Sequence, residues 1–223
     1  MNKIKLIILD VNETLFCLSG LDKVFHKIGL TTIHRELWFN STLREGFALN
    51  KINKFVSFGE IGKNIFMGIL KKNNISNACF IYDEILENFK KLKVQKNTYE
   101  GLYYLKKKNF KIATLTNGSK TITKHLLKNN NMEKLIDRCF SIDEIKSWKP
   151  SSKTYQLVTK YYNINPLNSL MIACHKWDLE GAKNAGLLTG YIERNVERSP
   201  GYYHTPDYSA RNILEISKKI VGE

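Results

Sequence analysis

The stretch LIILDVNETL at residues 6–15 decides the fold class of this 223-residue chain. Its first four residues are large and apolar, and they predict a buried strand that ends at Asp10. In an open parallel sheet, ligands bind outside the carboxyl ends of the strands, so Asp10 is placed to act as a nucleophile. Asn12 and Thr14 follow closely. Because Asp, Asn and Thr are also ordinary turn and capping residues, this segment taken alone leaves a structural role open.

Three later segments also place polar side chains beside a predicted strand or helix. Residues 111–116 (KIATLT) predict a strand that ends in the run Thr116-Asn117-Gly118-Ser119. Lys149-Pro150 precedes a predicted helix, and such a pair is also a plain helix start. Residues 169–173 predict another strand, which leads into Cys174-His175-Lys176-Trp177-Asp178 and a helix. The polar ends of these segments are therefore candidates for one shared site.

The order of the predicted elements gives the fold class. Apolar runs that alternate with helical segments predict an α/β fold, a doubly wound parallel sheet with a Rossmann-like core. These runs lie at residues 111–116, 138–141, 169–173 and 188–193. Residues 16–92 instead place apolar side chains at helical spacing. We therefore expect an α/β core domain of residues 1–15 and 96–223, with an inserted helical cap domain of residues 16–95.

In this order and at this spacing, the four motifs resemble those of the haloacid dehalogenase superfamily, over nearly the whole chain. Two departures from its phosphatases favour the 2-haloacid dehalogenase branch. Phosphatases carry an acid two residues after the nucleophile to move a proton, and the amide of Asn12 cannot do so. They also bind Mg²⁺ through paired acids in the last motif, where Ala173 and Cys174 offer no hard oxygen ligand. The resemblance thus implies catalysis without a metal or other cofactor.

The dehalogenase branch implies a reaction in two steps on a small-molecule 2-haloacid. The nucleophile displaces halide from carbon 2, and water then attacks the resulting aspartyl ester. On this resemblance Asp10 is the nucleophile, Lys149 and Asp178 orient it and activate water, and Thr14 joins this catalytic group. The residues expected to contact substrate are Asn12, Thr116, Asn117, Phe39, Tyr155, His175, Trp177 and Arg44.

The expected halide pocket departs from the better-known members of the branch. Those members receive the halide with an arginine of the first cap helix, and Phe39 stands at that position here. An aromatic edge can face a halide but brings no full charge. Arg35 and Arg44 lie about one helical turn to either side of Phe39. Each is either a substitute for the missing cation or a solvated residue of the helix. His175, where those members have an amide, is a further candidate for contact with halide or ester water.

Two other functions stay open. One is a phosphatase of the same superfamily that acts with Mg²⁺ on a small phosphate monoester, against which Asn12 and the missing second acid speak. The other is a non-catalytic binding protein of the same fold, which the joint presence of Asp10, Lys149 and Asp178 disfavours.

Composition limits the partners and the location that we expect. The 35 basic and 21 acidic residues give a net charge of +14, but lysines are spread along the chain without a nucleic-acid-binding motif. No apolar stretch of membrane-spanning length and no signal-peptide pattern is present, so we expect a cytoplasmic protein without membrane contact. The spacing of Cys17, Cys79, Cys139 and Cys174 suggests neither disulfides nor zinc. A homodimer is expected by analogy with the family.

The net charge generates a prediction about substrate capture. If the positive field concentrates small carboxylates near the cap, kcat/KM for a haloacid falls with added salt, because the screening length shortens to about 10 Å at 0.1 M. Halide release should be measured over a potassium sulfate series. A kcat/KM that does not change with ionic strength would contradict steering.

Overall fold

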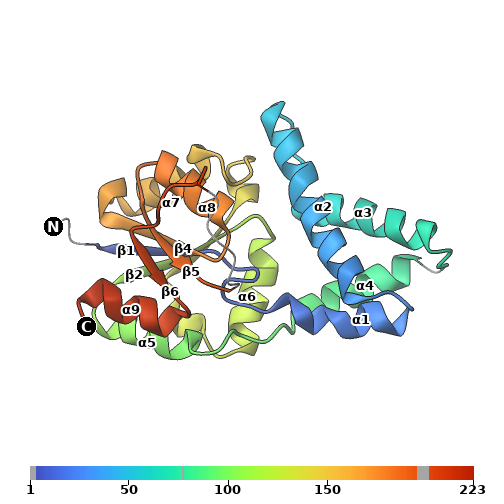
Figure 1. The fold of residues 1–223 in the computed structure, drawn as a ribbon, viewed down its shortest axis with the longest axis horizontal. Coiled ribbons are helices and arrows are strands. Elements are labelled where there is room, and N and C mark those ends of the chain that lie inside the picture. Colours follow the sequence, from blue (N-terminus) through green and yellow to red (C-terminus); the bar gives the residue numbers. More distant parts are fainter. Residues whose placement is uncertain (1–3, 77, 195–200) are drawn as a thin grey trace.

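The computed structural model describes residues 4–76, 78–194 and 201–223, and its centre is a six-stranded sheet of order β3-β2-β1-β4-β5-β6 (Figure 1). All neighbouring strands are parallel. The strands are β1 (Leu6–Leu9), β2 (Lys111–Thr116), β3 (Arg138–Ser141), β4 (Ser169–Ala173), β5 (Leu188–Ile192) and β6 (Tyr208–Ala210). The sequence predicted the first five of these. It did not predict β6, because three residues directly after Pro206 and Asp207 give almost no periodic signal.

Helices cover both faces of the sheet, which confirms the doubly wound α/β, Rossmann-like fold. On one face lie α5 (Thr98–Lys107), α6 (Lys120–Asn129) and α9 (Ile213–Val221), and on the other lie α7 (Ser152–Tyr162) and α8 (Lys176–Asn184). Short helices η2 (Glu133–Leu135), η3 (Ile142–Glu144) and η4 (Pro166–Asn168) occur in the connections. Successive side chains of a strand point to opposite faces, so Ile7 and Leu9 join one core and Leu6 and Ile8 the other. This two-sided burial explains why β1 is apolar throughout.

A helical bundle lies between β1 and α5 in the sequence and projects beside the sheet (Figure 1). It consists of η1 (Leu18–Leu21), α1 (Asp22–Lys27), α2 (Thr32–Lys51), α3 (Phe58–Lys72) and α4 (Ala78–Phe89). Its interior is aromatic: the ring of Phe25 meets Phe66 edge to face at 5.6 Å and Trp38 at 6.1 Å. The Trp38 indole N–H donates to the Gly62 carbonyl at 2.8 Å, so its polar atom is satisfied in this apolar setting.

Two linkers connect the bundle to the sheet, and they pair with each other. Gln95 N donates to Leu15 O at 2.8 Å, Cys17 N donates to Lys93 O at 3.0 Å, and Phe16 forms an antiparallel bridge with Val94. We infer that this crossing is the boundary between a cap unit, residues 16–95, and a core unit formed by the rest of the chain. The cap unit and the core unit keep these meanings below.

The strand order places the site. From β1 the chain adds β2 and β3 on one side and β4 on the other, so the connections diverge at the carboxyl ends of β1 and β4. Such a switch point leaves a crevice for ligands. Phe39 and Phe47 of α2 pack against His175 and Trp177 just after β4, so the cap unit covers this edge.

No helix in the described ranges is long and apolar enough to span a membrane. Cys17, Cys139 and Cys174 are free thiols, while the side chain of Cys79 falls outside the described part of the chain.

The packing of α5 on α9 generates a stability prediction. A Cβ at Gly101 would lie 2.7 Å from backbone atoms of Ile213 and Leu214, so Gly101→Ala should lower the free energy of unfolding by about 1–3 kcal/mol. Gly68 on α3 is the matched control, because an added Cβ there meets nothing within 4 Å. Gly68→Ala should stabilise the helix by up to about 1 kcal/mol. Urea unfolding compares the two variants, and equal midpoints would contradict the close approach.

Candidate active site

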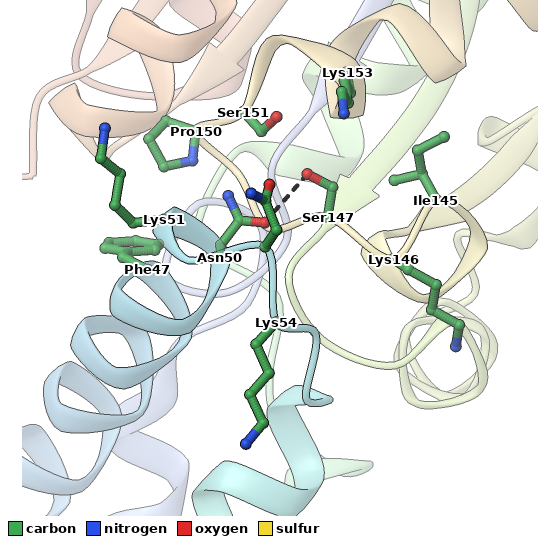
Figure 2. Close-up of a pocket in the computed structure, with 11 residues that line it drawn as sticks. Phe47, Asn50, Lys51, Lys54, Ile145, Lys146, Ser147, Pro150, Ser151 and Lys153 are labelled. Atoms are coloured by element: carbon green, nitrogen blue, oxygen red, sulfur yellow. Dashed lines mark hydrogen bonds between the residues drawn. The ribbon is translucent and has the colours of Figure 1, made fainter.

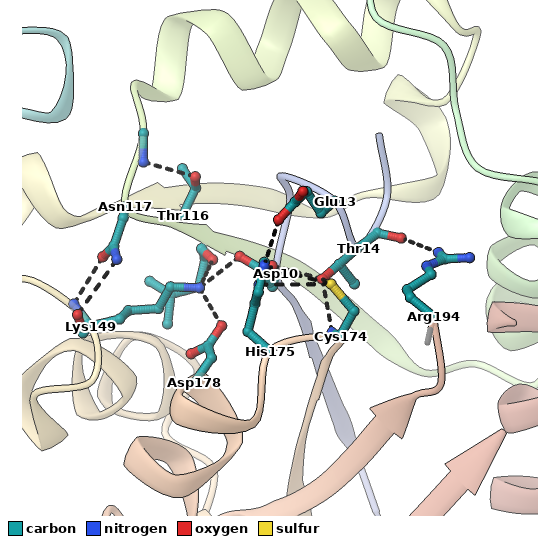
Figure 3. Close-up of polar contacts among 12 residues, drawn as sticks. Asp10, Glu13, Thr14, Thr116, Asn117, Lys149, Cys174, His175, Asp178 and Arg194 are labelled. Atoms are coloured by element: carbon teal, nitrogen blue, oxygen red, sulfur yellow. Dashed lines mark hydrogen bonds and ion pairs between the residues drawn. The ribbon is translucent and has the colours of Figure 1, made fainter. Parts of the chain in front are cut away.

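Asp10 follows β1 directly, and its carboxylate is the centre of a buried polar cluster (Figure 3). Lys149 Nζ donates to Oδ1 at 2.8 Å and Thr14 Oγ1 donates to Oδ2 at 2.7 Å. The Thr14 hydroxyl in turn accepts the Cys174 amide N–H at 3.1 Å, which ties the loop after β1 to the loop after β4. The four-residue spacing of Asp10 and Thr14 thus closes a turn that fixes the carboxylate.

Lys149 connects this carboxylate to a second one. Its side chain is fully buried, and Nζ donates to Asp10, to Asp178 Oδ2 at 2.5 Å and to the Leu115 carbonyl at 3.0 Å. An ammonium has three hydrogens to donate, so all three are used. The Asn117 side chain holds the Lys149 backbone, with Oδ1 accepting its N–H at 2.9 Å. Asn117 therefore holds the Lys149 loop in place, and its contact with substrate stays a prediction.

Asp178 and Tyr155 form the deepest part of the cluster. The Tyr155 hydroxyl donates to Asp178 Oδ1 at 2.6 Å, while Lys149 engages Oδ2. Both side chains are fully buried. Tyr155 therefore positions Asp178, and its expected contact with substrate stays a prediction.

The charges of the cluster follow from these contacts. Burial alone would raise the pKa of the Asp10 carboxyl, but the Lys149 ammonium and then His175 hold it well below its usual range. Burial alone would lower the pKa of Lys149, yet the Asp10 and Asp178 carboxylates raise it. Burial and the Asp178 charge raise the pKa of Tyr155 well above its usual value, so it keeps its proton. Asp10 is therefore an ionised carboxylate beside the Lys149 ammonium.

His175 reaches Asp10 from the loop after β4. Its Nδ1 lies 3.3 Å from Asp10 Oδ2, its Nε2 lies 2.8 Å from Glu13 Oε2, and 17% of its side chain is exposed. The ring stacks on Trp177 at 5.3 Å and lies 6.5 Å from Phe39. We did not identify Glu13 from the sequence, because it resembles any polar residue of a turn.

The cap unit meets the core loops through aromatic rings. Phe47 of α2 contacts Trp177 at 4.9 Å, and Phe58 of α3 lies 6.1 Å from Trp148. The Lys149 ammonium lies 5.8 Å above the Trp177 ring. Phe39 is buried in the same wall, so the position expected to bind halide is apolar.

The arginines lie elsewhere than the sequence suggested. Arg44 is exposed on α2, and none of the described polar contacts joins it to the Asp10 cluster. Arg35 is buried and pairs with Asp22 at 2.7 Å, so reading it as a solvated residue was wrong. Arg194 was missed: it follows β5 and donates to the Thr14 carbonyl at 2.7 Å. Arg194 belongs to none of the four motifs, so nothing in the sequence marked it as a residue of the site.

A cavity of about 240 Å³ separates the cap unit from the core unit beside this cluster. The core contributes Asn12, Thr116, Gly118, Ser119, Ile122 and Thr123, and the cap contributes Trp38, Phe58, Gly59, Tyr82, Leu86 and Phe89. The walls are mostly apolar, with polar groups gathered at the ends of β1 and β2. At that polar edge the Thr116 hydroxyl accepts the Gly118 N–H at 2.9 Å, which leaves its own hydrogen available.

A larger cavity, about 730 Å³, lies where α2 ends against the loop before α7 (Figure 2). Its lining includes Lys51, Lys54, Lys146 and Lys153, which are exposed and point in different directions. Asn50 Oδ1 spans the two units there by accepting Ser147 Oγ at 3.2 Å and Trp148 N at 2.9 Å. None of the residues around Asp10 lines this cavity, so we do not assign it to the reaction.

The residues around Asp10 do not fit Mg²⁺. Ala173 and Cys174 supply no hard oxygen ligand, and the Lys149 ammonium already occupies one side of Asp10. Within the described ranges, one close group of metal-ligating residue types exists, Asp10, Cys174 and His175. Both ring nitrogens of His175 face carboxylates, with Nδ1 toward Asp10 and Nε2 toward Glu13.

Comparisons with known proteins agree with this geometry. A curated relative, (S)-2-haloacid dehalogenase 4A of Burkholderia cepacia, is 24% identical over 170 residues, which cover 76% of this chain and 73% of the relative. A second, (S)-2-haloacid dehalogenase 1 of Pseudomonas sp. (strain CBS-3), is 24% identical over 208 residues, or 92% and 91% of the two chains.

The structure of L-2-haloacid dehalogenase from Xanthobacter autotrophicus superimposes with a TM-score of 0.90 at 18% identity, over 98% of this chain and 99% of that one. This likeness shows that the fold is shared. The family model for haloacid dehalogenase-like hydrolases matches residues 38–192, most of the chain. The chain therefore belongs to the family of haloacid dehalogenase-like hydrolases.

Proposed function

We propose that this hydrolase is a metal-independent 2-haloacid dehalogenase, which replaces the halogen of a short 2-haloacid with a hydroxyl group from water. The observation that carries this proposal is the Lys149 ammonium, 2.8 Å from Asp10 and fully buried. It supplies the positive charge beside the nucleophile without a metal ion. The printed names of the curated relatives, (S)-2-haloacid dehalogenases, favour the same reaction.

In the first step the Asp10 carboxylate attacks carbon 2 and the carbon-halogen bond breaks. A carbon-oxygen ester bond forms, and the halide leaves with the bonding electrons. Because halide needs no proton, Asn12 suffices where a phosphatase requires an acid. We assign the substrate's carboxylate to the polar edge of the 240 Å³ cavity, at Asn12 and the Thr116 hydroxyl, and its carbon chain to the apolar walls.

In the second step water attacks the ester carbonyl of Asp10. The bond to the alkyl oxygen breaks, a 2-hydroxy acid leaves, and the carboxylate is restored. Lys149 keeps its contact with the Asp10 carbonyl group and stabilises the negative charge that develops on its oxygen. Burial of the cluster under the cap unit keeps bulk water from competing in the first step.

A homodimer and a cytoplasmic location stay predictions.

The decisive experiment measures halide release from a panel of 2-haloacids in excess EDTA. We expect release by the wild-type protein and none by Asp10→Ala, because no other carboxylate can form the ester. Asp83→Ala, which changes an exposed aspartate of α4, should retain full activity.

Each other outcome has a definite meaning. No release from any haloacid would contradict the proposal, and phosphate-ester hydrolysis on adding Mg²⁺ would then identify a phosphatase. Release that disappears with EDTA would contradict the metal-independent mechanism.

A second prediction concerns Tyr155. Tyr155→Phe removes the hydrogen bond to Asp178 Oδ1 and leaves Lys149 less firmly held. A hydrogen bond to a charged group is worth about 1.5–3 kcal/mol, so kcat should fall about tenfold or more. Tyr103→Phe, at an exposed position of α5, is the control. Saturating halide-release rates of folded protein test this, and an unchanged kcat in Tyr155→Phe would exclude a positioning role.

A further inference from the structure

Glu13, His175 and Asp10 form a continuous chain of polar contacts that the two-step scheme above does not use (Figure 3). Glu13 Oε2 lies 2.8 Å from His175 Nε2, and His175 Nδ1 lies 3.3 Å from Asp10 Oδ2. A carboxylate on one ring nitrogen fixes the orientation and the tautomer of an imidazole. With its Nε2–H directed at Glu13, a neutral His175 presents the lone pair of Nδ1 to Asp10.

We take the unfavourable backbone conformation of Glu13 as evidence that its contact with His175 has a role. Its φ is +63°, in the left-handed region of backbone conformation that residues other than Gly and Asn rarely adopt. Eight described residues other than glycine have positive φ, and six of them are asparagine. Such a conformation costs about 1 kcal/mol or more for an ordinary residue. Glycine would avoid that cost at position 13 but would leave His175 without its carboxylate.

Asp178 is poorly placed to activate water. Both of its carboxylate oxygens are engaged, by Lys149 and by Tyr155, and its side chain has no exposed surface. His175 is partly exposed and reaches the Asp10 carboxylate itself. Of the two candidate bases, His175 is therefore the one whose side chain has exposed surface, 17% against 0% for Asp178.

We propose that His175 is the base that activates water for hydrolysis of the Asp10 ester, and that Glu13 is the positioning residue that holds its ring. This inference rests on the proposed function, because it assigns a role within the second step of that reaction. Glu13 acts only through His175 and does not touch the substrate.

The proton balance of the cycle is complete. In the resting protein His175 is an imidazolium between two carboxylates. When Asp10 becomes a neutral ester, His175 releases one proton to solvent, which is the net proton of the reaction. Nδ1 then accepts a proton from water as its oxygen bonds to the ester carbon, and returns that proton to the departing alkoxide. The restored Asp10 carboxyl group gives its remaining proton to His175.

The groups that face His175 support this sequence of charges. They are Asp10 and Glu13 from the loop after β1, Cys174 and Trp177 from its own loop and Phe39 from the cap unit. Burial alone would lower the pKa of His175, but Cys174 and the two carboxylates raise it well above its usual range. Loss of the Asp10 charge on ester formation removes one of these contributions and favours the neutral base.

Single-turnover kinetics of His175→Ala separates the two steps. We expect a burst of about one halide per protein, because the nucleophile is intact, followed by hydrolysis slowed by about 10²–10⁴. Mass spectrometry of the peptide that contains Asp10 should show the added acyl mass. The matched control is His125→Ala, at an exposed position of α6, which should accumulate no ester.

Glu13→Gln tests the positioning role through the pH profile of ester hydrolysis. The rate rises with pH as His175 loses its proton, and removal of the Glu13 charge lowers the pKa of His175. The rise should therefore move to lower pH, whereas a general loss of structure would lower the rate without moving it. Glu133→Gln, at an exposed position of η2, should leave the profile unchanged.

The possible failures can be told apart. No halide from the wild-type protein would overturn the proposed function and the role of His175 together. Halide release with normal ester hydrolysis in His175→Ala would overturn the role of His175 alone. An equal slowing of halide release and hydrolysis in that variant would also overturn it, because His175 would then serve the first step. An unshifted profile in Glu13→Gln would overturn the role of Glu13.

Discussion

The buried ammonium of Lys149 between the carboxylates of Asp10 and Asp178 is the interaction on which the site depends. It joins Asp10 at the end of β1, the Leu115 carbonyl near the end of β2, and Asp178 of α8. Removing one partner from such a buried pair leaves an uncompensated charge and costs about 3–5 kcal/mol. The segments that meet at the carboxyl edge of the sheet are therefore held in one arrangement, and the positions of Thr14, Asn117 and Tyr155 follow from it.

In the proposed function, the same ammonium takes the place that a metal ion has in a phosphatase. A nucleophile whose counter-charge comes from a fixed lysine needs no metal beside it, and its low pKa keeps it ionised. Such a nucleophile suits a mono-anionic substrate whose leaving group takes no proton. A phosphate ester would bring two negative charges, and Asn12 cannot protonate its leaving alkoxide as an acid at that position would.

The cap unit and the core unit supply different kinds of side chain to the site. The cap unit supplies apolar shape, through Phe58 and the other rings that line the cavity, and Phe39 packs against Phe58. The core unit supplies charge, through Lys149, His175 and the half-buried Arg194. The two kinds of side chain meet where the Phe39 ring lies 6.5 Å from the His175 ring.

The sequence by itself determined the fold class, and its resemblance to the superfamily supplied the four members of the central cluster, Asp10, Thr14, Lys149 and Asp178. Five strands appear in the sequence as apolar runs, and parallel strands bring their carboxyl ends together, so Asp10 and Thr116 were expected to lie close together. Only the tertiary structure decided which side chains line the cavity, as Asn12 and Thr116 do, and which contact other residues of the site, as Tyr155 and Asn117 do. It alone revealed the contacts of Glu13 with His175 and of Arg194 with Thr14. Those contacts join segments more than 150 residues apart and depend on one left-handed backbone angle and on side-chain rotamers, which hydrophobic periodicity does not encode.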